Sequence, residues 1–290
     1  MDRVHVDLNG PPATMLATLY AKALDADAEH PILGDQYAKA AVAKIDYDWR
    51  ATTISPRRAP SVAIRTAHFD RWTRQFLAVH EESVVLHVGC GLDARVYRLD
   101  PGPGVRWYDI DYPEVIELRE RVYPGRENYR VVAASVADPA WLREIPGDRP
   151  ALFLGEGLTM YLTERDGLAL LRRVVDQFPS GELQFDAFNT FGIRTQLINS
   201  VVRRSGSKLH WGIDGPSDIL DAVPGVRLLA WESVFDSDTF SLVSPAMRWL
   251  GRAMGAVPVL RTMAQYHRYA FGRDRSQDGN VERERALHKS

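Results

Sequence analysis

Residues 83–112 read SVVLHVGCGLDARVYRLDPGPGVRWYDIDY, and this stretch decides the fold of the chain. Its first apolar run ends in Gly89 and Gly91, and its second run, residues 105–110, is followed by Asp111. A buried strand, a glycine turn, a short helix and a second strand that ends in acid form a nucleoside site in α/β sheets. The glycines let the ligand approach the backbone, and the carboxylate binds the ribose hydroxyls.

Two acids lie at the end of the second run. Side chains alternate along a strand, so Asp109 and Asp111 are expected to point to the same face of the sheet. Asp111 is nearer the end of the strand and is therefore the expected ribose ligand. Asp109 either orients it or is solvated.

After residue 82, apolar runs typical of strands alternate with helical patterns, which predicts a parallel sheet with crossover helices. The expected strands are 83–89, 105–111, 128–135, 150–156, 181–188, 226–235 and 267–271. The expected helices are 92–99, 113–123, 139–145 and 163–178, with Thr163 as a cap of the last.

The chain before this alternation is mostly helical in pattern. Helices are expected at 14–28, 31–45 and 61–80, after an arm without periodic pattern at 1–12. One domain overall is predicted. It comprises a helical section at 1–82, an α/β core at 83–272 with a helical insertion at about 190–222, and a solvated polar tail at 273–290.

Composition excludes several classes of partner. The 290 residues carry a net charge of −2, which gives no basic excess for nucleic acid. No stretch approaches the length of an apolar membrane span, and the N-terminus lacks the apolar core of a signal peptide. A single cysteine, Cys90, fits a reducing compartment, and we expect a cytoplasmic protein. No histidine pair has metal-ligand spacing, so no metal is expected.

The glycine turn and the acid leave two cofactors open. A nicotinamide dinucleotide would require a glycine-lined helix N-terminus for its pyrophosphate and a residue that handles a proton. The chain has no Tyr-x-x-x-Lys pair, and a long helical section precedes the turn. S-adenosylmethionine has no phosphate and needs only close backbone approach, a ribose carboxylate and contacts for its amino-acid end. These observations favour S-adenosylmethionine, with a nicotinamide-dependent oxidoreductase as the alternative.

A second candidate site residue is Glu156. An apolar run, residues 152–154, ends in Gly155-Glu156-Gly157, which places this carboxylate at the carboxyl end of the sheet, where ligands of open α/β sheets bind. The functional interpretation is that Glu156 compensates the ammonium or sulfonium charge of the cofactor. The alternative is a solvated loop acid.

Several separated motifs occur in a characteristic order. They are LYAKAL (19–24), PILGD (31–35), DYDW (46–49), IRTAHFD (64–70), DARVYRL (93–99), DIDYP (109–113) and EGLTMYL (156–162). Together they resemble the leucine carboxyl methyltransferase family, and more closely its bacterial branch, which includes carboxyl O-methyltransferases of polyketide pathways. The resemblance covers roughly residues 4–272.

The resemblance implies a class I S-adenosylmethionine-dependent methyltransferase fold, with a Rossmann-like seven-stranded sheet and an N-terminal helical lid. In the family an arginine of the lid helix meets the cofactor carboxylate, and this position is Arg65; a lysine of the first helix, here Lys22, plays a similar part. A planar guanidinium suits that task because it grips a carboxylate bidentately. Family members carry Asp-Leu after the third strand to face the adenine. This chain has Ser135-Val136, and a serine is the weaker acceptor.

The motifs and the resemblance together give a set of candidate residues. The candidate cofactor-binding residues are Lys22, Arg65, Gly89, Cys90, Gly91, Asp109, Ile110, Asp111, Ser135, Val136, Glu156 and Gly157. Tyr161 is the candidate for orienting the acceptor, and Tyr20, Phe188 and Trp211 are candidate walls for a flat apolar substrate.

The expected reaction is methyl transfer from S-adenosylmethionine to an oxygen of a small molecule. A carboxylate is ionised at neutral pH and needs no general base, whereas a phenol would benefit from one. No obvious base stands out, so a carboxylate is favoured. The family resemblance implies that it belongs to an aromatic or polyketide-like compound, with a protein C-terminus as the alternative. A phenol acceptor and a non-catalytic S-adenosylmethionine-binding protein remain alternatives, and the oligomeric state stays open.

Overall fold

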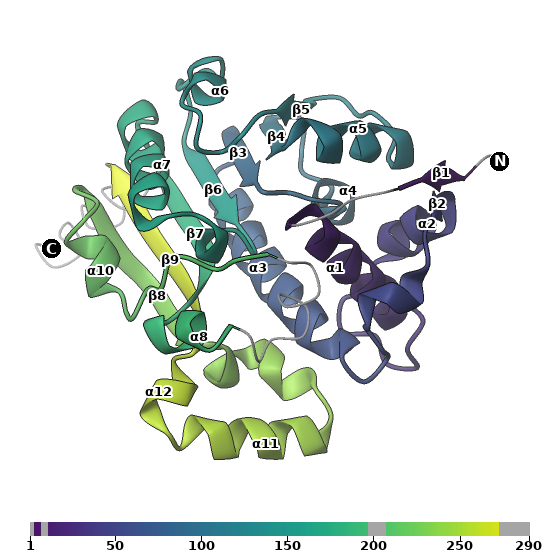
Figure 1. Ribbon diagram of the computed structural model, residues 1–290. Coiled ribbons are helices and arrows are strands. Elements are labelled where there is room, and N and C mark those ends of the chain that lie inside the picture. Colours follow the sequence, from purple (N-terminus) through teal and green to yellow (C-terminus); the bar gives the residue numbers. More distant parts are fainter. Residues whose placement is uncertain (1–2, 7–10, 197–206, 273–290) are drawn as a thin grey trace, which may run out of the picture.

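The computed structural model describes residues 3–6, 11–196 and 207–272, and its centre is one seven-stranded sheet (Figure 1). The strands are β3 (Ser83–Val88), β4 (Val105–Asp111), β5 (Tyr129–Ala133), β6 (Ala151–Gly155), β7 (Ser180–Phe188), β8 (Val226–Ser233) and β9 (Ala264–Gly272). Their spatial order is β5-β4-β3-β6-β7-β9-β8. The first five run parallel, and β9 pairs antiparallel with both β7 and β8. The predicted mostly parallel α/β sheet is confirmed.

Helices cover both faces of the sheet. One face packs against α6 (Ala140–Arg143), α7 (Glu164–Gln177) and α10 (Ser217–Leu220); the other packs against α3 (Ala59–Val79), α4 (Arg95–Leu99) and α5 (Pro113–Val122). Helices on both faces bury strand β3 on both sides. Its side chains alternate between the two faces, so Val84 packs in the first layer and Val85 in the second. The predicted cap of α7 is confirmed, since the Thr163 side chain accepts from the Asp166 N–H.

The section before the sheet lies over the second face. It consists of α1 (Pro11–Ala26), α2 (Gln36–Lys44) and the short helix η1 (Trp49–Thr52), and Figure 1 shows α1, α2 and α3 on the opposite side of the sheet from α7 and α10. Asp25 shapes the turn between α1 and α2, since its carboxylate accepts from the N–H groups of Ile32, Leu33 and Gly34. The PILGD motif is therefore built around a buried carboxylate that holds backbone, not around a ligand.

The expectation of an N-terminal arm without regular structure is wrong in part. Strand β1 (Val4–His5) pairs in parallel with β2 (Ile45–Asp46), directly after α2. The buried side chains of Val4 and Ile45 join the apolar cluster under α1. Two residues are too short to show a periodic pattern, so only this distant partner makes a strand of them.

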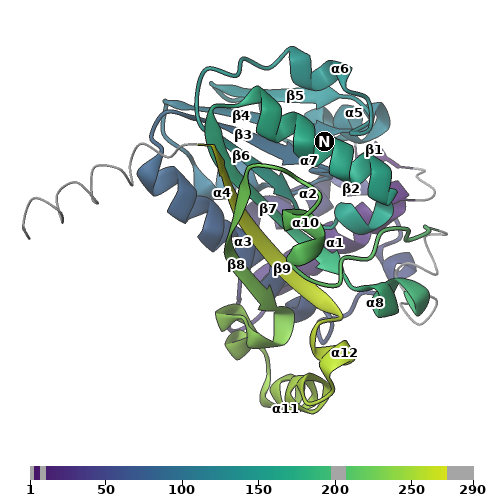
Figure 2. The same cartoon turned by 90° about the vertical axis from the view of Figure 1, so that its left-hand side faces the viewer.

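The region after β7 differs most from the prediction. Within 190–222, the described residues contain only the short helices α8 (Thr190–Arg194) and α10, with an extended segment from 207 onwards; part of this range and the tail at 273–290 lie outside the described residues. Four unpredicted elements follow β8, namely η4 (Val234–Asp236), η5 (Asp238–Leu242), α11 (Pro245–Gly255) and α12 (Pro258–Arg261). They project beyond one end of β8 and β9 (Figure 2).

None of the described helices is long and apolar enough to cross a membrane.

Candidate active site

A pocket of about 860 Å³ lies at the carboxyl ends of the parallel strands. The loops after β3, β4 and β6 form its floor, and residues of α1 and of the first half of α3 form the opposite wall. This is the edge of an open α/β sheet at which ligands bind. The volume lies in the upper part of the range of about 300–1,000 Å³ for small-molecule sites.

The glycine turn after β3 brings α1 close to the sheet. Gly89 and Gly91 have φ of +67° and +52°, which glycine adopts without steric cost. A Cβ on Gly89 would lie 3.0 Å from Leu158, and one on Gly91 would lie 3.0 Å from Met15 of α1. Larger residues would strain the turn and push α1 away, and both glycines line the pocket together with Cys90.

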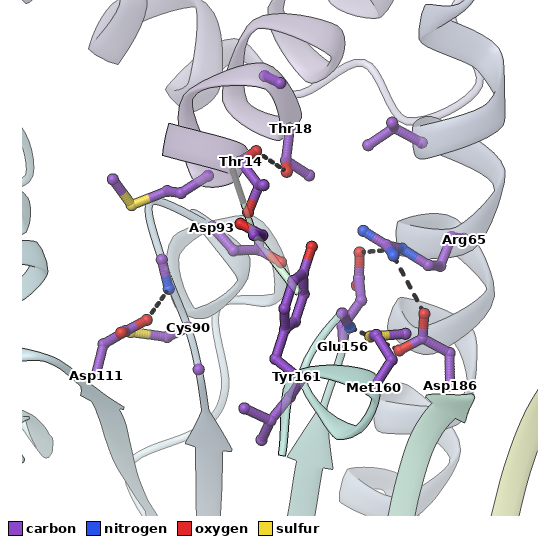
Figure 3. A pocket seen from close by; sticks show the side chains of 18 of the residues that line it. Thr14, Thr18, Arg65, Cys90, Asp93, Asp111, Glu156, Met160, Tyr161 and Asp186 are labelled. Atoms are coloured by element: carbon purple, nitrogen blue, oxygen red, sulfur yellow. Dashed lines mark hydrogen bonds and ion pairs between the residues drawn. The ribbon is translucent and has the colours of Figure 1, made fainter. Parts of the chain in front are cut away.

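Asp111 ends β4 beside this turn and lines the pocket. Its Oδ2 accepts from the Gly91 N–H and its Oδ1 from the Tyr112 N–H, both at 2.8 Å. Burial raises the pKa of this carboxyl, and the two backbone hydrogen bonds only partly oppose the shift. The backbone thus holds the carboxylate at one rim of the pocket (Figure 3).

Asp109 does not line the pocket, contrary to its prediction as a cofactor ligand. It lies one pleat deeper in β4, fully buried, and accepts from His87, the Trp107 indole N–H and the Tyr129 hydroxyl at 2.8–2.9 Å. It also forms an ion pair with Arg119, whose guanidinium donates to the Gly91 carbonyl over 3.0 Å. Asp109 therefore supports the glycine turn from behind.

The opposite end of the pocket carries Arg65, which reaches from α3 towards the sheet. Its Nε donates to Glu156 and its Nη1 to Asp186, each over 3.1 Å (Figure 3). Its side chain remains 25% exposed. Glu156 also accepts from the Thr66 hydroxyl at 2.8 Å, and Asp186 accepts from the Gly157 N–H at 2.6 Å. A guanidinium held on two sides by carboxylates is fixed in place before any ligand binds.

Lys22 of α1 also lines this end of the pocket. It is buried, and its ammonium lies 3.1 Å from Asp93 of the glycine turn. Burial opposes ionisation of Asp93, but Arg95, Lys22 and Arg98 outweigh it and hold the pKa of Asp93 well below its usual value. The two cationic residues proposed from the sequence thus lie at the same end of the pocket, each paired with acid.

A fully buried arginine, Arg95, stands behind this charged end. It donates to Asp70 of α3 over 2.6 Å and to Glu156 over 2.5 Å, and it lies 3.4 Å from Asp93. Burial by itself would raise the pKa of the Glu156 carboxyl. The positive charges of Arg95, Lys22 and Arg65 outweigh burial and lower this pKa to about 2. Arg95 therefore connects the long helix, the glycine turn and the loop after β6.

Asp93, Asp186 and Arg95 were not among the predicted site residues. Asp186 lies, like Glu156, at the carboxyl end of a parallel strand in the middle of the sheet. Because ligands bind at this edge of the sheet, the position of Asp186 in the sequence could have predicted it as a site residue. Burial raises the pKa of Asp186, and Arg65 counters this only in part. Arg95 gave no such signal, because nothing in a local pattern separates a buried arginine from a solvated one.

Other predicted residues divide between pocket and core. Tyr161 stands in the pocket between the Asp111 end and the Arg65 end (Figure 3). Burial is the main cause that raises the pKa of this phenol. Phe188, Gly157 and Val136 also line the pocket.

Besides Asp109, four predicted residues are not brought to the pocket. Tyr20 points away and stacks on Trp49, with ring centroids 5.3 Å apart. Trp211 is buried in the core against Gly167, where an added Cβ would lie 2.1 Å from its ring. Ile110 lies in the core beneath the turn. Ser135 does not line the pocket either, although its neighbours Ala134 and Val136 do.

The groups around the pocket fit S-adenosylmethionine. A backbone-held carboxylate suits the ribose hydroxyls, the glycine turn admits close backbone approach, and the far end offers cations for a carboxylate beside acids for an ammonium and a sulfonium. Fold and site together define a class I S-adenosylmethionine-dependent methyltransferase with a Rossmann-like sheet.

Comparison with known proteins narrows this class. The pattern of the leucine carboxyl methyltransferase family matches residues 13–175. The tetracenomycin polyketide synthesis O-methyltransferase TcmP of Streptomyces glaucescens is 41% identical over 266 residues, which cover 92% of this chain and 98% of the relative. The S-adenosyl-L-methionine-dependent methyltransferase dpfgK of Gibberella zeae is 35% identical over 250 residues, 78% of this chain and 83% of the relative.

Among solved structures, a duf574 family protein from Streptomyces avermitilis has a TM-score of 0.53 at 15% identity, covering 88% of this chain and 97% of its own; this likeness concerns the fold alone. The chain belongs to the leucine carboxyl methyltransferase family. It is an S-adenosylmethionine-dependent O-methyltransferase, as the sequence motifs predicted, and not a nicotinamide-dependent oxidoreductase.

Proposed function

We propose that the enzyme methylates a carboxylate of an aromatic, polyketide-like small molecule. The observation that carries the proposal is the 41% identity to a polyketide O-methyltransferase over 98% of that relative's length. The pocket supports it, because beyond the charged end its walls include Val62, Tyr161 and Phe188, which suit a flat apolar body. On its single cysteine, we also propose the cytoplasm as its compartment.

The cofactor contacts follow from the charges in the pocket. Asp111 would hold the ribose, and Lys22 and Arg65 the carboxylate of the amino-acid end. Glu156 and Asp186 would compensate the positive charges of the cofactor. The turn at Gly89 to Gly91 would lie along the methionine part, and Ala134 and Val136 beside the adenine. When bound, S-adenosylmethionine supplies an electrophilic methyl carbon.

The chemistry asks little of the protein beyond alignment. Transfer to a carboxylate forms one O–C bond, breaks one S–C bond and moves no proton. The residues of the pocket therefore need to hold donor and acceptor in line and to exclude water.

The described residues at the charged end of the pocket offer no free base for a phenol acceptor. Glu156 and Asp186 already accept from Arg65, and burial keeps the Tyr161 phenol protonated at neutral pH. None of these groups is placed to take a proton from a phenol, whose pKa is near 10. A carboxylate acceptor arrives ionised and needs no such base.

A labelled-methyl assay with naphthalene-2-carboxylate and 2-naphthol as competing acceptors tests the proposal. We expect incorporation into the acid, in a product that mild base hydrolyses because it is an ester. Label in a base-stable ether would replace the carboxylate by a phenol as the acceptor. Asp111→Asn should lose the activity, whereas Asp148→Asn, at an exposed pair with Arg106, should keep it.

A further inference from the structure

The extended segment that follows residue 206 forms a wall of the pocket beyond Tyr161. Its backbone is held in place: the His210 N–H donates to the Met160 carbonyl over 2.8 Å, and the Ile213 N–H to the Phe188 carbonyl over 2.9 Å. The Gln196 side chain bonds both the N–H and the carbonyl of Leu209, at 2.8 and 3.1 Å. The side chains of this segment therefore have fixed directions.

Alternation along the segment decides which side chains face the pocket. Leu209 and Trp211 are only 3% and 5% exposed and point into the protein. Lys208 and His210 are exposed and line the pocket. Successive side chains of an extended segment point to opposite sides, so burial of Leu209 and Trp211 leaves Lys208 and His210 on the other side, where both line the pocket.

The charge of Lys208 is not balanced within the pocket. Each of the four carboxylates that line the pocket already has partners, namely Asp93 with Lys22, Glu156 and Asp186 with Arg65, and Asp111 with backbone N–H groups. Among the described residues, no ion pair or hydrogen bond engages the Lys208 ammonium. The outer part of the pocket therefore presents a positive charge to whatever occupies it.

Depth separates this charge from the reacting centre. Glu156 and Asp186, which we place beside the transferred methyl group, are buried with side chains 5% and 8% exposed. Lys208 is exposed at the mouth. An acceptor with its reacting carboxylate at the buried end thus meets Lys208 with a different part of its body.

On the basis of the proposed function, we propose that Lys208 binds a second anionic group of the acceptor, distal to the carboxylate that is methylated. The ligand class is an aromatic acid with at least two anionic groups. Lys208 is then a residue for substrate selection, with no part in the methyl transfer itself. Because methylation neutralises only the inner carboxylate, the ester product keeps this outer contact.

A pair of probes isolates the contact. Affinities of naphthalene-2-carboxylate and naphthalene-2,6-dicarboxylate are measured by calorimetry on the S-adenosylhomocysteine-loaded protein, for the wild type and for Lys208→Gln. We expect the dicarboxylate to bind the wild type about five-fold more tightly, which is the size of a good exposed ion pair. Lys208→Gln should abolish this preference beyond the statistical advantage of two equivalent carboxylates, and rising salt should reduce it in the wild type.

The matched control is Lys39→Gln, which removes an equal charge from an exposed lysine of α2 that is paired with Asp27. It should keep the preference, and all three proteins should bind S-adenosylhomocysteine equally well. A wild type without preference for the dicarboxylate, or a preference that survives in Lys208→Gln, overturns the inference. Failure of the proposed function looks different, because the wild type then forms no base-labile product from either acid.

Discussion

Arg95 donates a hydrogen bond from Nη2 to Oε2 of Glu156 over 2.5 Å, and the two side chains are only 0% and 5% exposed. The same guanidinium binds Asp70 of α3, the helix that also carries Arg65. The Glu156 carboxylate, which follows β6, is therefore held by Arg95 on its buried side and by Arg65 on the side of the pocket. The ligand-facing charges belong to a larger buried network that joins the helical section to the sheet.

Replacing Arg95 by Met tests how much this network contributes to the free energy of unfolding. The variant removes the fully buried guanidinium that Asp70, Asp93 and Glu156 share. Buried negative charge is then left undercompensated, and the expected loss in free energy of unfolding is roughly 3–5 kcal/mol. Urea denaturation measures it. Arg106→Met, which breaks a partly exposed pair with Asp148, should cost less than about 1 kcal/mol. Equal effects of the two variants would contradict the buried network.

The depressed pKa of Glu156 predicts a pH dependence of stability. The folded-state pKa is about 2 against an ordinary 4.5, so ionised Glu156 stabilises the fold above pH 4.5. That contribution is lost as the pH falls from 4.5 towards 2. In Glu156→Gln the free energy of unfolding should therefore fall less steeply over this range than in the wild type, as denaturant titrations at several pH values can show. Parallel curves would mean that Glu156 titrates normally in the folded state.

Asp111→Asn keeps the shape of the side chain and removes its charge. If the carboxylate accepts from both ribose hydroxyls, S-adenosylhomocysteine affinity should fall about 100-fold, because hydrogen bonds to charged groups are the strong ones. Calorimetry measures the change, with Asp148→Asn as the control. Unchanged affinity would remove Asp111 from the cofactor site. Since burial raises the pKa of Asp111, cofactor affinity of the wild type should also weaken as its carboxyl is protonated in acid.

Arg65→Lys retains a positive charge but loses the planar fork that reaches Glu156 and Asp186 together. We expect at least about ten-fold weaker S-adenosylhomocysteine binding, from the loss of a charge-assisted bidentate contact. Arg71→Lys, on the same helix but paired with exposed Asp238, is the matched control and should bind normally. A loss confined to acceptor affinity would assign Arg65 to the substrate.

Trp211→Ala separates a core residue from a pocket wall. Trp211 is buried over Gly167, so its removal leaves a cavity, and roughly 3–5 kcal/mol of stability should be lost. The control is Trp249→Ala on α11, where the tryptophan is 71% exposed and its removal should change the free energy of unfolding little. Thermal or urea unfolding of the two variants compares them directly. A stable Trp211→Ala protein would restore its interpretation as a wall of the pocket.

Several features were readable from the sequence because they depend on short-range physics. Positive φ at Gly89 and Gly91, burial of the run before them and an acid at the end of the next strand all follow from a local strand–turn–strand pattern. Glu156 could be placed by the same logic, since the carboxyl ends of parallel strands meet at one edge. The family motifs added Arg65 and Lys22.

Failures of prediction occurred where neighbours along the chain do not determine direction. Asp109 and Asp111 are both acids at the end of one strand, yet one pleat of depth makes the first a support for the turn and the second a pocket residue. Trp211 looked like a wall, but the backbone bonds of its segment turn it inwards and Lys208 outwards.

By itself the sequence determined the strand order along the chain, the glycine turn and the acid at the end of the next strand, because each rests on residues close together in the chain. The kind of cofactor was also readable from the sequence, through motifs that recur in a family. Only the tertiary structure decided how Arg65, Asp186 and Glu156 pair, that Arg95 is buried behind them, and which side chains of the segment at 207–213 line the pocket. These depend on contacts between segments far apart in the chain. Burial makes each such charge costly unless its partner is in place, so packing and pairing decide the site together.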